Sequence, residues 1–346
     1  EKVKLKELSF FSRQLSVLID AELPLIQSLG LLAEQQKNKY FARVITEVKE
    51  DVEAGAALNQ ALRKHPKVFD DLYCNLVASG EQSGSLDTML RRLADYQESM
   101  LKLRAKVKQA MIYPAAIVTF AIIVAIFMLW KIIPVFGGIY QELGAQLPGL
   151  TAAVLGLSNF VSDYIILIVV GLIAIVVLYR RWSKTPAGRE IVDRTKLKLP
   201  VMSNLMQKIS LSRFTRTLST LIGGGVPMLE SLKIASTTTD NVIIERQVLN
   251  ARQMVSEGKS LHDSLKQASQ DQFPAMMIQM VNVGESTGTL DEMLGKLANF
   301  FDDEVDNAVS SLLSALEPLV LIFVGGIVGT LVISMYLPLF NLIQQF

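Results

Sequence analysis

The sequence has few cysteines and histidines, residues that are common in disulfide-bonded secreted proteins and in many catalytic and metal sites. It has one cysteine, Cys74, and two histidines among 346 residues. A single cysteine excludes an internal disulfide, which favours a reducing compartment for the bulk of the chain. Neither His65 nor His262 belongs to a motif with a cysteine or a pair of carboxylates. We therefore expect no catalytic centre and no metal centre built on these side chains.

The sequence also lacks a charge excess and a nucleotide-binding motif. Its 34 basic and 33 acidic residues leave a net charge of +1, so we expect no nucleic-acid partner. It contains no G-x-x-x-x-G-K-[ST] motif and thus no P-loop for ATP hydrolysis. The charged start, Glu1 to Glu7, has no apolar signal core, and because it does not begin with Met we expect the sequence to be trimmed there. We expect no enzymatic activity and no cofactor.

Three long apolar runs dominate what is present. The chain is 50% hydrophobic with a mean hydropathy of +0.35. The runs cover 115–136, 164–179 and 318–340. About twenty apolar residues span a hydrocarbon core as a helix, and the shorter second run carries no charge. Three buried core helices are the alternative, but charge-free stretches of this length are rare in soluble proteins. We predict three transmembrane helices.

The basic residues predict how these spans are oriented. The segment between the first two spans, 136–162, contains only Glu142 as a charge. Cytoplasmic flanks are enriched in Lys and Arg, which places the N-terminal region and the segment after the second span in the cytoplasm. The third span then runs outward and leaves 341–346 outside. The basic residues are Lys102, Arg104, Lys106 and Lys108 before the first span, and Arg180, Arg181, Lys184 and Arg189 after the second.

The chain repeats itself. FSRQL at Phe11 recurs 203 residues later as FTRTL at Phe214, and the offset rises to 204 between Gly80 and Gly284. Self-similarity at a steady offset over more than a hundred residues indicates a duplication. The repeated unit is a soluble domain followed by one span. The prolines where the outer two spans begin and end share the offset of 204: Pro114, Pro134, Pro318 and Pro338.

Each soluble copy has helical periodicity and almost no strand pattern. We therefore predict an all-α membrane protein with two duplicated cytoplasmic antiparallel helical bundles. The predicted segments are a first cytoplasmic domain at 1–110, a span at 111–136, a periplasmic loop at 137–162, a span at 163–180, a second cytoplasmic domain at 181–313, a span at 314–340 and a periplasmic tail at 341–346.

One polar phrase stands out in both copies. GEQSGSLDTML begins at Gly80, and GESTGTLDEML begins at Gly284. We expect these two glycines to end one helix in the left-handed conformation, and Ser85 and Thr289 to begin the next. The positions that we treat as candidates for a family motif or a partner contact are Gly80, Glu81, Gly84, Leu86 and Asp87, with Gly284, Glu285, Gly288, Leu290 and Asp291.

A helix–turn–helix corner does not require the carboxylates of Glu81 and Glu285. Each could accept hydrogen bonds from backbone N–H groups, contact a partner subunit, or bind a weak divalent cation at a dimer interface. One carboxylate per copy supplies too few hard ligands for calcium without backbone or partner oxygens. These three readings stay open at this point.

Taken together, these features resemble the PilC/GspF family, the inner-membrane platform proteins of type IV pilus and type II secretion machines. The resemblance covers nearly the whole chain and is carried by two helical domains with G-E-x-[ST]-G-x-L-D, each followed by a proline-opened span. The IPVF and MYLPLF endings and the AMIYP segment are closer to the pilus branch. Asp-Ala-Glu at 20–22, opposite three glycines at 223–225, departs from the family's glycine-rich turn.

The resemblance implies a non-enzymatic platform in the bacterial inner membrane. Its implied partners are hexameric assembly and retraction ATPases, pilin subunits, other inner-membrane pilus components and further copies of itself. A transporter is the rival class, but transporters place ionisable residues at mid-bilayer, whereas Lys131 and Glu317 lie near span ends. The outer loop is too short for a receptor domain. Gly325 and Gly329 form a G-x-x-x-G motif, which permits close helix packing.

Overall fold

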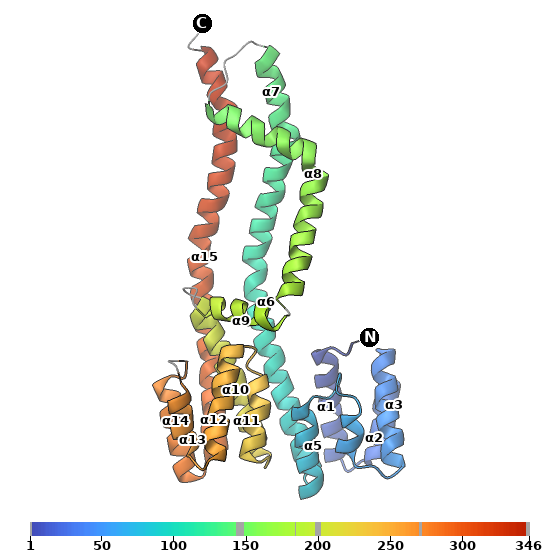
Figure 1. The fold of residues 1–346 in the computed structure, drawn as a ribbon. Helices are drawn as coiled ribbons and strands as arrows, with labels where there is room; N and C mark the ends of the chain where they lie inside the picture. Colours follow the sequence, from blue (N-terminus) through green and yellow to red (C-terminus); the bar gives the residue numbers. More distant parts are fainter. Residues whose placement is uncertain (1, 143–148, 184, 198–201, 270–271, 344–346) are drawn as a thin grey trace. The chain divides into compact units, whose positions relative to one another are not determined.

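The computed structural model describes residues 2–142, 149–183, 185–197, 202–269 and 272–343. Within these residues the regular elements are all helices, and no strand occurs (Figure 1). The predicted all-α class is therefore confirmed. The chain divides into two compact units. We call Glu1–Lys106 with Asp193–Ala308 the soluble unit, and Val107–Val192 with Val309–Phe346 the membrane unit.

The first soluble repeat packs its helices around an aromatic core. Phe11, Phe41, Phe69 and Tyr73 are almost fully buried, and the Phe11 and Phe41 rings meet edge to face with centroids 5.4 Å apart. Such pairs add to the stabilisation from burial alone. The helices are α1 (Leu5–Asp20), α2 (Leu25–Gln35), α3 (Lys39–Glu53), α4 (Leu58–Arg63), α5 (Asp71–Ser83) and the first part of α6 (Leu86–Phe127).

The second soluble repeat follows the same order of helices. Its core contains Phe214, Phe273 and Met277, and Phe214 lies at the position of Phe11 in the first repeat. The duplication is thus present in the structure as well as in the sequence. The helices are α10 (Met202–Gly223), α11 (Met228–Thr237), α12 (Val242–Ser256), α13 (Leu261–Ala268), α14 (Ala275–Thr287) and the first part of α15 (Leu290–Ile343), with α9 (Pro186–Lys196) preceding them.

Three helical stretches are long and apolar enough to cross a membrane: Leu86–Ile139, Gly149–Trp182 and Leu290–Leu337. They contain the first two predicted spans and residues 314–337 of the third. Both α6 and α15 run without interruption from a soluble repeat into a span. Each therefore passes through the domain–span limits that the sequence suggested near 110 and 313. Pro114 lies inside α6 because a membrane helix can tolerate the loss of one backbone hydrogen bond.

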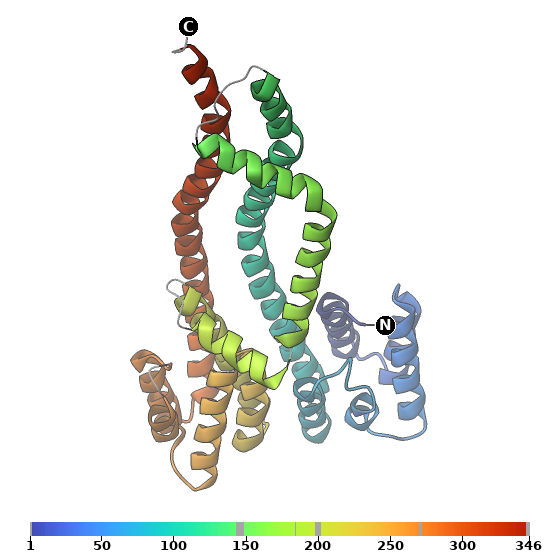
Figure 2. The same ribbon diagram turned by 45° about the horizontal axis from the view of Figure 1, so that its top comes forward.

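The connecting segment predicted at 137–162 is helical in the residues that the structure describes. Those residues lie in α7 (Ile133–Glu142) and in the first half of α8 (Gly149–Trp182). Thr151, Val154 and Ser158 share one helical face and are buried, which explains why this weakly charged stretch folds as a helix. At Tyr164 the backbone leaves helical geometry, with φ −116° and ψ 15°, and the two halves of α8 run in different directions (Figure 2).

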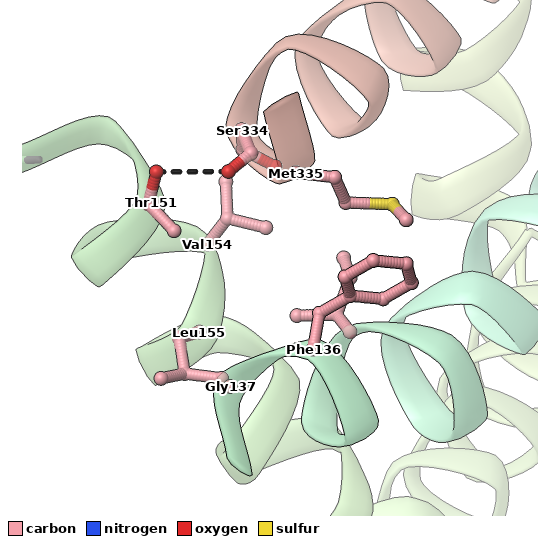
Figure 3. A pocket seen from close by; sticks show the side chains of 8 residues that line it. Phe136, Gly137, Thr151, Val154, Leu155, Ser334 and Met335 are labelled. Carbon is pink, nitrogen blue, oxygen red and sulfur yellow. Dashed lines mark hydrogen bonds between the residues drawn. The ribbon is translucent and has the colours of Figure 1, made fainter. Parts of the chain in front are cut away.

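Hydroxyl-to-carbonyl hydrogen bonds hold the first half of α8 against α15 and against Met128–Ile132 in the membrane unit. The Thr151 hydroxyl donates to the Ser334 carbonyl at 2.8 Å, beside a small pocket that Phe136, Val154 and Met335 also line (Figure 3). Ile133, Val154 and Leu331 form the apolar cluster behind it. These contacts join α7, α8 and α15 within the membrane unit.

A π-turn, η1 (Met128–Ile132), separates α6 from α7. Pro134 follows it and has no N–H, so the helix around it leaves backbone carbonyls without their usual donors. The Ser158 hydroxyl donates to the Leu129 carbonyl, and the Ser162 hydroxyl lies 3.5 Å from the Trp130 carbonyl. Unsatisfied backbone groups are costly in lipid, so the hydroxyls of α8 stabilise this bend.

We predict that Ser158→Ala lowers the unfolding free energy of the full chain in lipid nanodiscs by about 1 kcal/mol, because it leaves the Leu129 carbonyl without its donor. Thermal unfolding of the wild type and the variant measures the difference. Ser311→Ala, at an exposed position of α15, is the matched control and should leave the transition unchanged. Equal shifts in both variants would contradict this role for Ser158.

Candidate functional site at the repeated helix corner

The repeated phrase forms the corner between α5 and α6 and again between α14 and α15. The left-handed residues are Gly84, with φ 68°, and Gly288, with φ 72°. Our expectation for Gly80 and Gly284 is therefore wrong, since both lie inside the last turn of their helices. The Ser85 N–H donates to the Gly80 carbonyl at 2.9 Å, which closes the helix end one turn later than predicted.

Gly80 and Gly284 have a different role, which is close packing. A Cβ on Gly80 would lie 3.0 Å from Leu86 Cα, and a Cβ on Gly284 would lie 2.9 Å from Leu290 Cα. Both glycines are buried. The following helix can approach this closely only because neither position carries a side chain. The two glycines of each phrase thus serve separate purposes, one steric and one conformational.

The carboxylate of Glu81 binds the start of α4. Its Oε1 accepts from the Leu58 N–H at 2.6 Å, and its Oε2 accepts from the Asn59 N–H at 3.0 Å. The Asn59 side-chain amide also donates to Oε2, at 2.6 Å. These backbone donors belong to the first turn of α4, where helical N–H groups have no partner within the helix.

Glu285 repeats this arrangement in the second copy. Its Oε1 accepts from the Leu261 N–H at 2.7 Å, and its Oε2 accepts from the His262 N–H at 3.0 Å. Each glutamate therefore caps a short helix that lies more than twenty residues earlier in the chain. A carboxylate is favoured there because the helix N-terminus carries a partial positive charge.

The three readings of these glutamates can now be compared. The geometry supports backbone capping, although the donors come from α4 and α13 and not from the corner itself. A cation would have to compete with two N–H donors on each carboxylate. In the part of the chain that the structure describes, no group of three or more His, Cys, Asp or Glu side chains could hold a metal ion. Cation binding and contact with a partner stay predictions.

The other positions of the phrase support the corner. Leu290 is buried, and Leu86 packs against the first repeat's core. Asp87 and Asp291 lie in the first turn of α6 and α15, as expected from the helix dipole. The Asp291 carbonyl also accepts from the Ser219 hydroxyl at 2.8 Å.

An arginine that sequence reasoning missed ties the first helix of each repeat to the helix after the corner. Arg13 Nε donates to Glu98 at 2.8 Å, and a further guanidinium nitrogen contacts Asp95. The hydrogen bond from Arg13 lowers the pKa of Glu98 below its usual value. In the second repeat Arg216 binds Asp302 and donates to Asn299 at 3.0 Å. The arginine that FSRQL and FTRTL share at the same position was the one sequence signal that could have identified this contact.

The remaining candidate residues are the prolines of the spans and the two glycines of the G-x-x-x-G motif, all in the membrane unit. Pro134 lies in the first turn of α7, and Pro318 lies within α15. Pro338 is also in α15, but its side chain is outside the described residues. A Cβ at Gly325 or Gly329 would meet no atom within 4 Å among the described residues, so neither glycine serves close helix packing there.

Cys74 is unsuited to nucleophilic chemistry. Its side chain is buried in the core of the first repeat. Burial raises the pKa of its thiol to about 11, which keeps the reactive thiolate scarce at neutral pH.

Comparison with known proteins shows similarity over both repeats and their spans, and not only at the repeated corner. A family model described as type II secretion system (T2SS), protein F matches residues 11–134 and 214–338, which cover each soluble repeat and the span that follows it. The chain belongs to the PilC/GspF family. This is a family of inner-membrane platform proteins of pilus and secretion machines, and it is structural and not enzymatic.

Relatives from both branches of the family align along almost the whole chain. The "Type IV pilus assembly protein PilC" of Myxococcus xanthus is 41% identical over 97% of this chain and 80% of its own length. The protein of the same name from Pseudomonas aeruginosa is 40% identical over 99% of this chain and 91% of its own length. The "Type II secretion system protein F" of Vibrio cholerae is 34% identical over 97% and 82%.

We predict that Glu285→Gln destabilises the full chain by about 1–2 kcal/mol, because the amide group turns a donor toward a backbone N–H that then lacks a partner. Glu81→Gln should act similarly on α4. Urea unfolding in detergent measures both. Glu292→Gln, which removes only an exposed pair with Lys296, is the control and should change little.

A cation role for these glutamates makes a different prediction. If Ca²⁺ or Mg²⁺ raised the unfolding midpoint of the wild type but not of Glu81→Gln or Glu285→Gln, the carboxylates would be metal ligands and the capping account would fail. We expect the same midpoint with the cations and with EDTA.

We also predict that the two glycines of one corner respond differently to substitution. Gly84→Ala should cost about 1 kcal/mol through the left-handed backbone, and Gly84→Asn should cost less because Asn tolerates that conformation. Gly80→Ala should cost more than either, because its Cβ meets the backbone of α6. Thermal unfolding of the three variants tests the order. If Gly84→Asn were as harmful as Gly80→Ala, the assignment of roles would be wrong.

Proposed function

We propose that this chain is the platform protein of a type IV pilus machine. In this role it couples a cytoplasmic hexameric ATPase to the insertion or removal of pilin subunits at the inner membrane. The observation that carries the proposal is the similarity of about 40% identity to pilus assembly proteins over nearly the full chain. Secretion-branch relatives are 33–35% identical over comparable lengths, whereas pilus-branch relatives range from 35% to 43%.

The continuity of α6 and α15 supports mechanical coupling. With a rise of 1.5 Å per residue, the 42 residues of α6 and the 54 residues of α15 make rods of about 60 and 80 Å. Each rod begins in a soluble repeat and ends in a span. A displacement applied to a soluble repeat therefore reaches the bilayer without passing through a flexible linker.

The arrangement of charge supports the proposed orientation. Among the described residues, the basic side chains next to the spans lie on α6 before the first span and on α8 and α9 after the second. By the positive-inside rule both soluble repeats face the cytoplasm, where an ATPase is accessible, and the C-terminus faces the periplasm. The apolar spans would then be the surface that meets the membrane helices of pilin subunits.

A clean gene deletion, with separate assays for surface pili and for secreted exoproteins, tests the assignment. We expect pili to be lost and secretion to be normal. Loss of secretion with normal pili would assign the chain to the type II secretion branch. If both were normal while uptake of a solute fell, the platform role would be refuted in favour of a transporter.

Coupling through the rods can be tested in the complemented deletion strain. We predict that four glycines inserted after Gln109, within α6, abolish most surface pili while protein level and membrane insertion stay normal, because the insert interrupts the rod. The same insertion after Gly258, in the exposed turn between α12 and α13, is the control and should retain pili. Full piliation with the α6 insert would contradict rigid coupling.

A further inference from the structure

The two soluble repeats contact each other through different faces. The contact joins α5 and α6 of the first repeat to α10 and α11 of the second. The Ser79 hydroxyl donates to the Gly224 carbonyl, and the Tyr96 hydroxyl lies 3.2 Å from the Thr217 hydroxyl. A Cβ on Gly224 would lie 2.6 Å from Leu76 Cδ2, so the backbone there rests directly on α5.

Apolar side chains fill this contact. Leu221, Val226 and Ile234 of the second repeat belong to the same buried cluster as Leu76 and Met89 of the first. Their exposed fractions are 0%, 7% and 5%. The second repeat thus completes the core of the first, and the contact is an integral part of the soluble unit.

Because the repeats are duplicates, each carries a counterpart of both contacting faces. Among the described residues, one face of each kind is not used in the contact between the repeats. We call Leu18, Asp20, Ala21, Leu23 and Leu31 the α1/α2 face. These residues are the first-repeat counterparts of Leu221, Gly223, Gly224, Val226 and Ile234. We call Met280, Val283, Met293, Lys296 and Phe300 the α14/α15 face. These are the second-repeat counterparts of Leu76, Ser79, Met89, Arg92 and Tyr96.

The unused faces leave apolar side chains exposed. Leu31 is 41% exposed, against 5% for its counterpart Ile234. Leu23 and Leu31 also line an open groove of about 550 Å³. On the other face Val283 is 50% exposed and Phe300 is 41% exposed. Both replace hydroxyl-bearing counterparts, so this free face is more apolar than the one used within the chain. Exposed apolar patches of this kind mark interaction sites.

Charge on the two unused faces is complementary. Within the chain a Cβ on Gly223 would lie 2.5 Å from a guanidinium nitrogen of Arg92. The counterparts of that pair are Asp20 and Lys296, which carry opposite charges. Each is about half exposed and pairs only at the surface, Asp20 with Arg91 and Lys296 with Glu292. A contact between the two unused faces would bring them together.

Asp-Ala-Glu at 20–22, which replaces the three glycines at 223–225, also fits a contact between the two unused faces. Ala21 replaces Gly224 and adds a Cβ where Leu76 leaves no space in the internal contact. The counterpart of Leu76 is Met280, whose unbranched side chain adapts to irregular surfaces. The backbone at Glu22 has φ 61°, close to the φ of 75° at its counterpart Gly225, so the turn has the same shape in both repeats.

We propose that the α14/α15 face of one copy binds the α1/α2 face of a second copy, in the manner in which the first repeat binds the second within one chain. Such a contact is head to tail and not two-fold symmetric, so it builds a ring or an open row of copies. Because each repeat leads into a span of the same direction, copies joined in this way keep one orientation in the membrane. The proposal does not depend on which machine the chain serves.

Disulfide cross-linking in membranes tests the contact directly. In a Cys74→Ala background, Ala21→Cys and Val283→Cys chains with different tags are co-expressed. These positions match Gly224 and Ser79, which touch within one chain. We expect a cross-linked dimer between unlike chains and none between like chains. Thr46→Cys with Gln253→Cys, both exposed and outside the two faces, is the control pair.

A charge exchange tests the same contact with Cys74 intact. Asp20→Lys and Lys296→Asp should each reduce the oligomer fraction seen by mass photometry, and the double variant should restore it. Arg91→Gln, which breaks only the pair with Asp20 inside one chain, is the matched control and should leave the oligomer intact. Cross-links between like chains, absence of the mixed cross-link, or single charge variants with an unchanged oligomer would overturn the proposal.

Discussion

A soluble domain that leads directly into a membrane span can occur twice on one side of a bilayer only if a further span returns the chain. The architecture depends on this constraint. Both repeats continue into their spans through one helix, α6 or α15, and α8 supplies the return. Two spans lie between the repeats, so the repeats are on the same side of the membrane and can meet. Their contact buries Leu221, Val226 and Ile234 in the core of the first repeat. A single span between the repeats, without this return, would place them on opposite sides of the membrane.

The duplicated corner is the local feature that makes each repeat rigid. Gly80 and Gly284 allow the helix after the corner to pack closely, Gly84 and Gly288 allow the turn, and the glutamates between them cap α4 and α13. Arg13 and Arg216 then tie the first helix of each repeat to α6 or α15. The same side-chain types therefore connect the same elements twice. A motif that looks like a binding site in the sequence is, in its described contacts, a structural joint that holds a rod in place.

The sequence predicted the class of fold, the duplication and the three spans because apolar length and a steady offset depend on no tertiary contact. Sequence-based prediction failed where the same residues are compatible with two local structures. Either glycine of the phrase could be left-handed, and only the approach of Leu86 to Gly80 separates them. The stretch at 137–162 looked like a loop because it is short and weakly charged, whereas Thr151, Val154 and Ser158 give it a packed helical face. The acceptors of Arg13 lie more than eighty residues away, so no local pattern identified them.

The central claim is that both repeats lie on the cytoplasmic side and the end of α7 lies on the other. The most direct measurement is thiol labelling of spheroplasts with a membrane-impermeant reagent, in a Cys74→Ala background with one added cysteine at a time. Thr46→Cys reports on the first repeat, Gln253→Cys on the second and Gly138→Cys on α7. The account predicts that only Gly138→Cys is labelled in intact spheroplasts, and that the other two react after lysis. Labelling of Thr46→Cys and Gln253→Cys from opposite sides would contradict it.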